Sequence, residues 1–321
     1  MTMISYAQNR EDVLLNRLFP PGHEGFYIDI GASHPCLHSV TKHFYDRGWR
    51  GINIEPVESV FNLLRAERPR DVNLNIGLSD FEGSLTFYEA IDSLGMSTFS
   101  RDFAGGLRRD GFACIERTVS VTTLARVCEQ YAPGTIDFLK IDVESHERAV
   151  IAGGDWRRWR PRVVVIESTG PEGWSGPLLE ASYLAATCDG LNTYFIREED
   201  RDLLPRLARP VGVFDDYIPH EHHQALEDLR QQLGVIRAQL DQAQFELWKK
   251  RMALDEIHGQ YDTMKAQLER LSSELEEART RLALLGDLGP RTILLARRLR
   301  GAARRIPGLC SALRGLLPTA G

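Results

Sequence analysis

A short apolar segment at residues 26–30, Phe-Tyr-Ile-Asp-Ile, leaves this chain few choices of fold. Apolar residues without alternation are typical of a strand that is buried on both faces of a parallel sheet. Gly31, Ala32 and Ser33 follow directly and predict a tight turn, at which a ligand can approach the backbone closely. The segment therefore predicts an α/β domain in which the Asp29 carboxylate lies beside a ligand site.

A second carboxylate follows about one strand–helix–strand unit later. Glu55 ends the apolar segment 51–54, and this spacing suits an acid that accepts hydrogen bonds from both hydroxyls of a ribose. Together with Asp29, it predicts a nucleoside cofactor. No Gly-x-Gly-x-x-Gly opens the first crossover, which disfavours a dinucleotide-dependent dehydrogenase.

Three segments resemble, in their order, the FkbM family of S-adenosylmethionine-dependent methyltransferases. They are residues 29–32 (DIGA), 48–56 (GWRGINIEP) and 136–144 (IDFLKIDVE), and the resemblance covers roughly residues 5–200. It implies a Rossmann-like, class I methyltransferase sheet with S-adenosylmethionine as cofactor. Members are typically O-methyltransferases, so it also implies a hydroxyl acceptor on a glycan, a glycolipid or a related cell-surface or secondary-metabolite molecule.

The resemblance assigns cofactor contacts beyond the first two acids. Gln8 and Asp12 match a Gln-x-x-Glu-Asp opening that usually lies close to the cofactor, with an ordinary polar helix face as the alternative. Asp80 follows the third strand, where such proteins commonly hold the adenine amino group, with a plain turn residue as the alternative. The predicted cofactor-binding residues are Gln8, Asp12, Asp29, Gly31, Ser33, Glu55, Asp80 and Asp142.

Acidic residues also follow the buried strands predicted at residues 136–141 and 162–167. The predicted catalytic residues there are Asp142, Glu144, His146 and Glu167. Ligands bind at the carboxyl ends of parallel strands, so we expect these side chains to converge over one pocket. A sugar hydroxyl is a weak nucleophile, and a general base, with Asp142 or Glu144 as first choice, would assist the transfer. A divalent ion held by these acids is the alternative, although no metal-binding residues are predicted.

A non-catalytic scaffold is the competing functional class. It would be a methyltransferase fold tethered by a coiled coil to a membrane or a partner protein. Ser33 and Ser145 stand where the family usually has Asn and Gly, which favours the scaffold. Retention of Asp29, Glu55 and Asp142 favours the enzyme.

Further elements are predicted from apolar patterns and breakers. Helices are expected at residues 5–18, with Ser5 as N-cap, and at 57–68, 123–131 and 177–188. Extended segments are expected at residues 72–78, 85–89 and 118–121, and a closing antiparallel hairpin at 192–196 and 211–218. A Gly-rich, basic stretch at residues 95–111 is predicted to be a lid over the substrate, with loop padding as the alternative.

Beyond residue 225 the sequence follows a strict heptad. One seam position is Leu or Tyr from Leu226 to Leu282, and the other is apolar from Leu229 to Leu285 except at Lys250. Nine unbroken heptads predict a coiled coil, about 90 Å long at 1.5 Å per residue. Glu246 with Arg251, and Glu274 with Arg279, have the spacing of interchain pairs in a parallel homodimer. A helix that folds back on its own domain is the alternative.

The last residues form a third region. After Pro290 arginines occur without any acid, and apolar residues share the opposite face of a helical wheel. This pattern predicts a helix on an anionic membrane, ahead of docking on a partner protein and of a disordered tail. The predicted division is a methyltransferase domain at residues 1–220, a coiled coil at 221–286 and a basic amphipathic tail at 287–321.

Charge and cysteine content bear on the setting. The formal net charge of −6 gives no overall attraction to nucleic acid. Five cysteines without Cys-x-x-Cys spacing indicate free thiols in a reducing compartment and disfavour a structural zinc site. No signal peptide opens the chain and no apolar run reaches the length of a membrane span. We expect a cytoplasmic protein, at most peripheral on the inner face of the cytoplasmic membrane.

Overall fold

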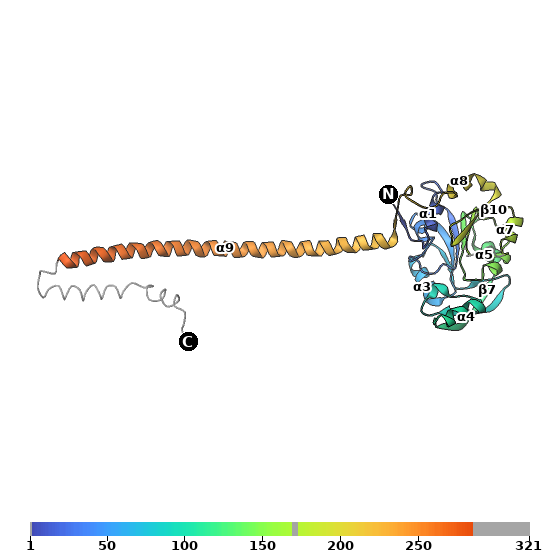
Figure 1. Cartoon of the computed structure of the whole chain (residues 1–321), viewed down its shortest axis with the longest axis horizontal. Helices are drawn as coiled ribbons and strands as arrows, with labels where there is room; N and C mark the ends of the chain where they lie inside the picture. The colour runs from blue at the N-terminus through green and yellow to red at the C-terminus, as the bar shows by residue number, and fades with distance from the viewer. Residues whose placement is uncertain (1, 169–172, 285–321) are drawn as a thin grey trace. The chain divides into compact units, whose positions relative to one another are not determined.

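The computed structural model describes residues 2–168 and 173–284 (Figure 1). The chain divides into two compact units, Met1–Leu229 and Arg230–Gly321. The first unit contains the sheets and most of the helices. The second consists, in its described part, of the continuation of one long helix.

A mixed sheet of seven strands forms the centre of the first unit. The strand order is β10-β11-β9-β8-β2-β3-β4. Their bounds are β2 Phe26–Ile30, β3 Arg50–Ile54, β4 Val72–Leu74, β8 Phe138–Ile141, β9 Val163–Glu167, β10 Tyr183–Cys188 and β11 Asn192–Arg197. β4, β3, β2, β8 and β9 run parallel, while β11 is antiparallel to β9 and β10 to β11. The predicted α/β sheet is therefore confirmed.

Helices and two smaller sheets surround this sheet (Figure 1). The helices are α1 Glu11–Asn16, α2 Lys42–Asp46, α3 Glu58–Glu67, α4 Arg101–Arg109, α5 Leu124–Tyr131, α6 Glu147–Ala152, α7 Gly176–Glu180, α8 Leu204–Leu207 and the 3₁₀ turns η1 Leu94–Met96 and η2 Glu198–Leu203. One small sheet has the order β5-β7-β6, from β5 Gly77–Leu78, β6 Gly83–Ala90 and β7 Cys114–Thr122. The other pairs β1 Met3–Ser5 in parallel with β12 Tyr217–Pro219.

The strand register brings four strand ends to one edge. Ile30 at the end of β2 is aligned with Ile54 on β3 and with Ile141 on β8. Ile141 is in turn aligned with Ile166 on β9. The chain therefore leaves these four strands at the same level, and the residues that follow them are brought together without any long loop.

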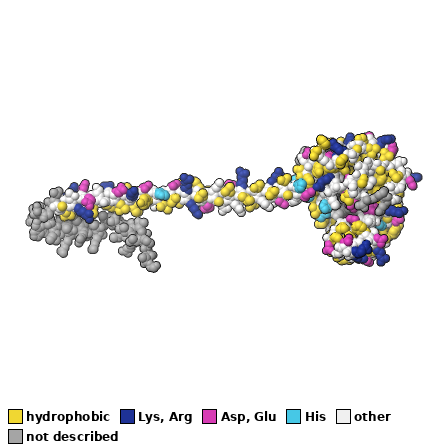
Figure 2. All heavy atoms as spheres, viewed as in Figure 1, with side chains coloured by type: hydrophobic (Ala, Val, Ile, Leu, Met, Phe, Trp, Pro, Cys, Tyr) yellow, Lys and Arg dark blue, Asp and Glu magenta, His cyan; other side chains and the backbone are white. Residues whose placement is uncertain are grey.

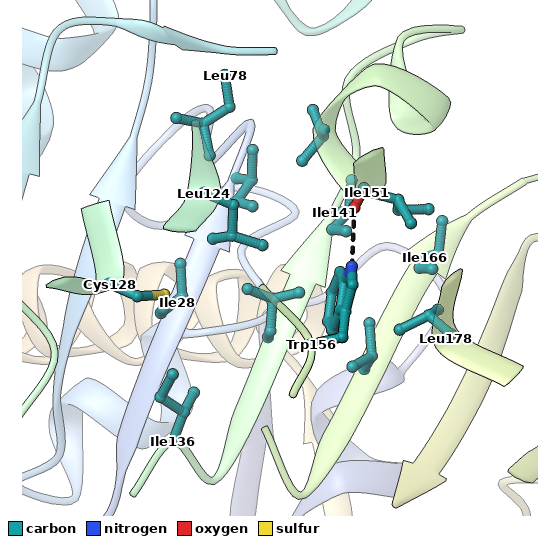
Figure 3. Packing of buried hydrophobic residues seen from close by; sticks show 14 of the residues in the cluster. Ile28, Leu78, Leu124, Cys128, Ile136, Ile141, Ile151, Trp156, Ile166 and Leu178 are labelled. Carbon is teal, nitrogen blue, oxygen red and sulfur yellow. Dashed lines mark hydrogen bonds between the residues drawn. The ribbon is translucent and has the colours of Figure 1, made fainter. Parts of the chain in front are cut away.

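The sheet is buried on both faces, as its continuous apolar strands predict. Alternate residues of a strand enter opposite cores: Ile28 packs in one cluster and Tyr27 in the other. Figure 3 shows the first cluster, in which Trp156 fills the space beside Ile166 and donates from Nε1 to the Ile151 carbonyl over 2.8 Å. The packing makes the central strands a rigid support for the residues at their ends.

Two sequence predictions near the end of the domain are wrong. The helix expected at residues 177–188 ends at Glu180, and residues 183–188 form the edge strand β10. The expected hairpin between 192–196 and 211–218 is absent, because β10 is the partner of β11 and Tyr217–Pro219 pairs with β1. Leu184, Ala185 and Ala186 have high helix propensity, and tertiary strand pairing overrides it here.

Two further elements differ in their bounds. The helix expected at residues 5–18 is the strand β1, a loop and the shorter α1, and Ser5 is not its N-cap. The strand expected at 72–78 ends at Leu74, and residues 77–78 join the small sheet instead. The helices predicted at residues 57–68 and 123–131 are confirmed as α3 and α5 within one residue.

Helix α9, His220–Leu284, continues without interruption for 65 residues. The predicted long helix is thereby confirmed, whereas its pairing in a coiled coil stays a prediction. The predicted basic tail at residues 287–321 and the last seam residue, Leu285, lie outside the described residues.

Two observations bear on the predicted setting. None of the helices within the described ranges combines the length and apolarity needed to cross a membrane. Cys36, Cys114, Cys128 and Cys188 carry free thiols. The cytoplasmic, membrane-peripheral location stays a prediction.

Candidate active site

A cavity of about 450 Å³ opens at the edge where β2, β3, β8 and β9 end. Its walls include Asp29, Glu55, Asp142, Glu144 and Glu167, each from one of these strands or from the turn that follows it. The volume lies in the range of small-molecule sites. The carboxylates predicted at separate strand ends are thus brought to one cavity.

The turn after β2 depends on Gly31. This residue has a φ of 75°, and a Cβ added to it would lie 1.8 Å from the carbonyl oxygen of Asp142. The N–H groups of Gly31 and Ala32 both donate to the Ile54 carbonyl, over 3.0 and 3.1 Å. The turn is therefore pressed against the segments that follow β3 and β8, which only glycine allows.

Asp29 is the most deeply buried carboxylate of the cavity. Its side chain is 1% exposed, and Oδ2 accepts a 2.9 Å hydrogen bond from the Thr41 hydroxyl. Oδ1 has no hydrogen-bond partner among the described residues; the Lys140 Nζ lies 3.9 Å from it. Burial raises the pKa of Asp29, against the opposing influence of Lys140. A buried carboxylate oxygen without a donor is an acceptor for a ligand in the cavity.

Glu55 closes the neighbouring wall. Its two oxygens accept backbone N–H groups, Oε2 from Ser33 over 2.9 Å and Oε1 from Val57 over 2.8 Å. Burial raises its pKa to about 7, although these two hydrogen bonds favour the charged form. Each carboxylate oxygen has a further lone pair, so Glu55 can still accept hydroxyl groups.

Lys140 organises the acids at the end of β8. This lysine lies within a buried strand, and its Nζ is 2.8 Å from Oδ2 of Asp142. Burial opposes the charge of Asp142, but Lys140 and hydrogen bonds from Lys140 and Glu167 outweigh it and hold the pKa of Asp142 below its usual range. The Asp142 carboxylate is therefore the stable anion of the cavity.

Glu167 is the protonated neighbour of Asp142. Burial, followed by the negative charge of Asp142, raises the pKa of Glu167 to about 9. The two carboxyl groups are hydrogen-bonded to each other, so at neutral pH they share one proton, which Glu167 holds.

The pKa of Glu144 lies between those of Asp142 and Glu167. It lies in a left-handed turn (φ 49°) with Ser145 (φ 71°), and Thr98 Oγ1 donates to its carbonyl. Burial, followed by the charges of Asp142 and Glu147, raises the pKa of Glu144 to about 7. At neutral pH this carboxyl therefore changes between a proton donor and a proton acceptor.

Of the remaining predicted site residues, some line the cavity and others do not. Gln8 and Ser33 line the cavity, whereas Asp12, Asp80 and His146 do not. Asp12 is buried and accepts from the Ser5 hydroxyl and the Tyr6 N–H, each over 2.7 Å. It therefore holds the loop that carries Gln8. Asp80 is exposed.

The stretch predicted as a lid contributes to the cavity only through its first part. Residues 95–97 and Phe99 of this stretch line the cavity, together with Ser93 and Leu94 just before it. The Arg101–Arg109 helix, which contains the basic residues, does not.

Comparison with protein-family models decides the family. The model of the methyltransferase FkbM domain matches residues 29–195, just over half of the chain. The chain belongs to the FkbM methyltransferase family. The match begins at Asp29 within β2 and ends at Phe195 within β11, so it contains β3, β4, β8, β9 and β10 in full.

Solved structures with similarity to the chain include other methyltransferases. A methyltransferase FkbM from Methylobacillus flagellatus KT is 15% identical over 54% of this chain and 43% of its own, with a TM-score of 0.31. A TehB-like SAM-dependent methyltransferase from Corynebacterium glutamicum is 9% identical over 59% and 87%, with a TM-score of 0.34. An O-methyltransferase from Bacillus cereus, solved with SAH, is 12% identical over 59% and 80%, with a TM-score of 0.29.

Similarity of this extent adds nothing on substrate or mechanism. The chain spans less than half the length of the first of these structures. A search of curated proteins found no match.

The FkbM domain also uses residues that the sequence did not single out. Lys140 could have been recognised from the sequence, because a lysine within an apolar strand must find a charge partner. Arg68 is fully buried and bonds to the Ser39 hydroxyl over 3.0 Å and to the Pro35 carbonyl. It fixes the loop that presents Thr41 to Asp29. Within the described ranges of the FkbM protein, no group of three or more His, Cys, Asp or Glu side chains is arranged to hold a metal ion.

Proposed function

We propose that this protein transfers the methyl group of S-adenosylmethionine to a hydroxyl oxygen, with a sugar hydroxyl of a glycan or glycolipid as the acceptor. The observation that carries the proposal is the ring of carboxyl groups around one cavity at the ends of β2, β3, β8 and β9. Family membership supports methyl transfer.

The residues present fit the cofactor. The unpartnered Oδ1 of Asp29 is a buried anionic acceptor in the cavity wall and suits the ammonium group of the methionine part. Glu55, on the adjacent strand, would accept the two ribose hydroxyls. When bound, S-adenosylmethionine supplies an electrophilic methyl group on a sulfonium sulfur that leaves with the electron pair.

The carboxyl groups over β8 and β9 divide the proton handling. Glu144, with a pKa of about 7, is the general base that takes the acceptor hydroxyl proton as the new carbon–oxygen bond forms. Glu167 keeps its proton in the hydrogen bond with Asp142, so the two carboxyl groups together carry one negative charge beside the base. The positive charge of Lys140 balances that of Asp142, so Asp142 adds little negative charge beside the proposed base, Glu144.

The cofactor is tested by calorimetry on the full chain. S-adenosylmethionine should bind the unsubstituted protein, and Glu55→Ala should weaken binding by roughly 1.5–3 kcal/mol because two hydroxyls lose a charged acceptor. Asp29→Asn should weaken it similarly. A full chain that does not bind S-adenosylmethionine would replace this proposal with the non-catalytic scaffold.

The acceptor is tested by transfer of labelled methyl groups to cell-envelope glycolipid fractions. Glu144→Gln should abolish most transfer and leave cofactor affinity unchanged. Glu129→Gln, an exposed acid with the same substitution, is the matched control and should be fully active. Cofactor binding without transfer to these fractions would retain the cofactor assignment and reject the acceptor class.

A further inference from the structure

An apolar stripe runs along helix α9, on the part that belongs to the second unit. Leu233, Leu247 and Leu268 are 64%, 68% and 60% exposed, and their neighbours in the heptad pattern are similarly open. Figure 2 shows apolar side chains exposed along this helix. A continuous exposed apolar surface of this length marks an interaction site.

The two edges of this stripe carry different charges. One edge, the position after the second seam residue, has only basic or uncharged residues: Arg230, Arg237, Gln244, Arg251, His258, Lys265, Ser272 and Arg279. The other edge, the position before the first seam residue, is Gln232, Gln239, Glu246, Ala253, Gln260, Gln267 and Glu274, up to Arg281. This asymmetry determines which arrangement of two helices is favourable.

We propose that α9 pairs with α9 of a second copy of this chain as a parallel, in-register, two-stranded coiled coil. In an antiparallel pair, the basic edge of one helix lies against the basic edge of the other in every register, which is repulsive. In a parallel pair, the basic edge of one helix lies against the other edge of its partner. Each residue of that other edge then faces the basic-edge residue that lies five positions further along the partner helix. Glu246 then faces Arg251 of the second copy, and Glu274 faces Arg279.

Between the two edges, no pair of like charges arises within the described residues in the parallel arrangement. The other residues that face the basic edge are Gln or Ala. The charged edges also favour two strands over a larger bundle, because in a bundle these positions are removed from water and their charges would be desolvated.

Lys250 sets the register. It is the polar residue of the seam, and in the parallel pair it meets Lys250 of the second copy. A single polar seam residue lowers stability but penalises shifted registers, which would bury it against apolar residues.

The dimer is tested by sedimentation equilibrium of the full chain, which should give twice the chain mass of 36.3 kDa. A monomer or a trimer would overturn the proposal. This measurement does not depend on methyl transfer, so its failure would leave the proposed function intact.

Orientation is tested by cysteine cross-linking under mild oxidation. Leu233→Cys alone and Leu275→Cys alone should each form cross-linked dimers in the parallel pair. Gln231→Cys and Ser273→Cys, which lie opposite the seam, are the matched controls and should cross-link no more than the unsubstituted chain. Cross-links that form only in a mixture of the two seam variants would show an antiparallel pair.

Charge reversal tests the edge pairs. Glu246→Arg should weaken dimerisation roughly tenfold, because two attractive pairs become repulsive, and adding Arg251→Glu should restore it. Lys250→Leu should strengthen the dimer. No recovery in the double variant would contradict the parallel pairing of these edges.

Discussion

Replacement of Gly31 by alanine tests how the cavity is assembled. The new Cβ would lie 1.8 Å from the Asp142 carbonyl oxygen, whereas such contacts are essentially never shorter than 3.0 Å. The turn after β2 and the end of β8 would have to separate by about 1.2 Å, and overpacking of this kind costs about 1–3 kcal/mol. The left-handed backbone adds about 1–2 kcal/mol. We expect a total loss of about 2–5 kcal/mol in the free energy of unfolding.

Gly22→Ala is the matched control. Gly22 has a φ of 83° but no atom within 4 Å of an added Cβ, so its replacement carries the backbone penalty without the overlap. Urea unfolding should place Gly31→Ala below Gly22→Ala in stability, and calorimetry should show weakened S-adenosylmethionine binding only for Gly31→Ala. Equal stabilities of the two variants, with unchanged cofactor affinity, would refute this account of the turn.

Three further predictions concern the same cavity. Methyl transfer should rise as the pH increases through about 7, where Glu144 loses its proton, and a pH–rate profile of Glu144→Gln should lack this rise and be roughly 10²-fold slower. Ser145→Gly (φ 71°) and the distant Ser182→Gly (φ 59°) should each raise the free energy of unfolding by about 1 kcal/mol in urea, whereas only the former should alter turnover. The folded state raises the pKa of Glu55 to about 7, so stability without cofactor should be greatest below the unfolded pKa near 4.5 and decline as the pH rises to 7. Urea midpoints at pH 5 and 7.5 should show a smaller decline for Glu55→Gln.

The strands and the acids at their ends were predictable, because burial fixes the composition of the strands and parallel topology fixes where they end. A parallel strand covered on both faces must be apolar throughout, and its carboxyl end must lie beside those of its neighbours. Four acids could therefore be recognised at strand ends in the sequence, and all four line the same cavity: Asp29, Glu55, Asp142 and Glu167.

Other parts depend on contacts that local sequence does not encode. Residues 183–188 favour a helix locally and become a strand only because β11 offers an edge. Asp12 is acidic and near the predicted site, but Ser5 and Tyr6 turn its carboxyl group inward. The participation of residues 93–97 in the cavity wall follows from the path of the connection between β6 and β7, for which the sequence has no periodic signal.

The pairing of β1 with β12 has a consequence for synthesis of the chain. Residues 3–5 have their strand partner at residues 217–219, and Arg17 forms an ion pair with Asp215 over 2.6 Å. The segment at residues 3–5 is thus translated long before its strand partner. At 5–20 residues per second, β1 waits about 10–40 s for this partner. An arrest of translation before residue 217 would therefore leave a nascent domain in which β1 has no strand partner.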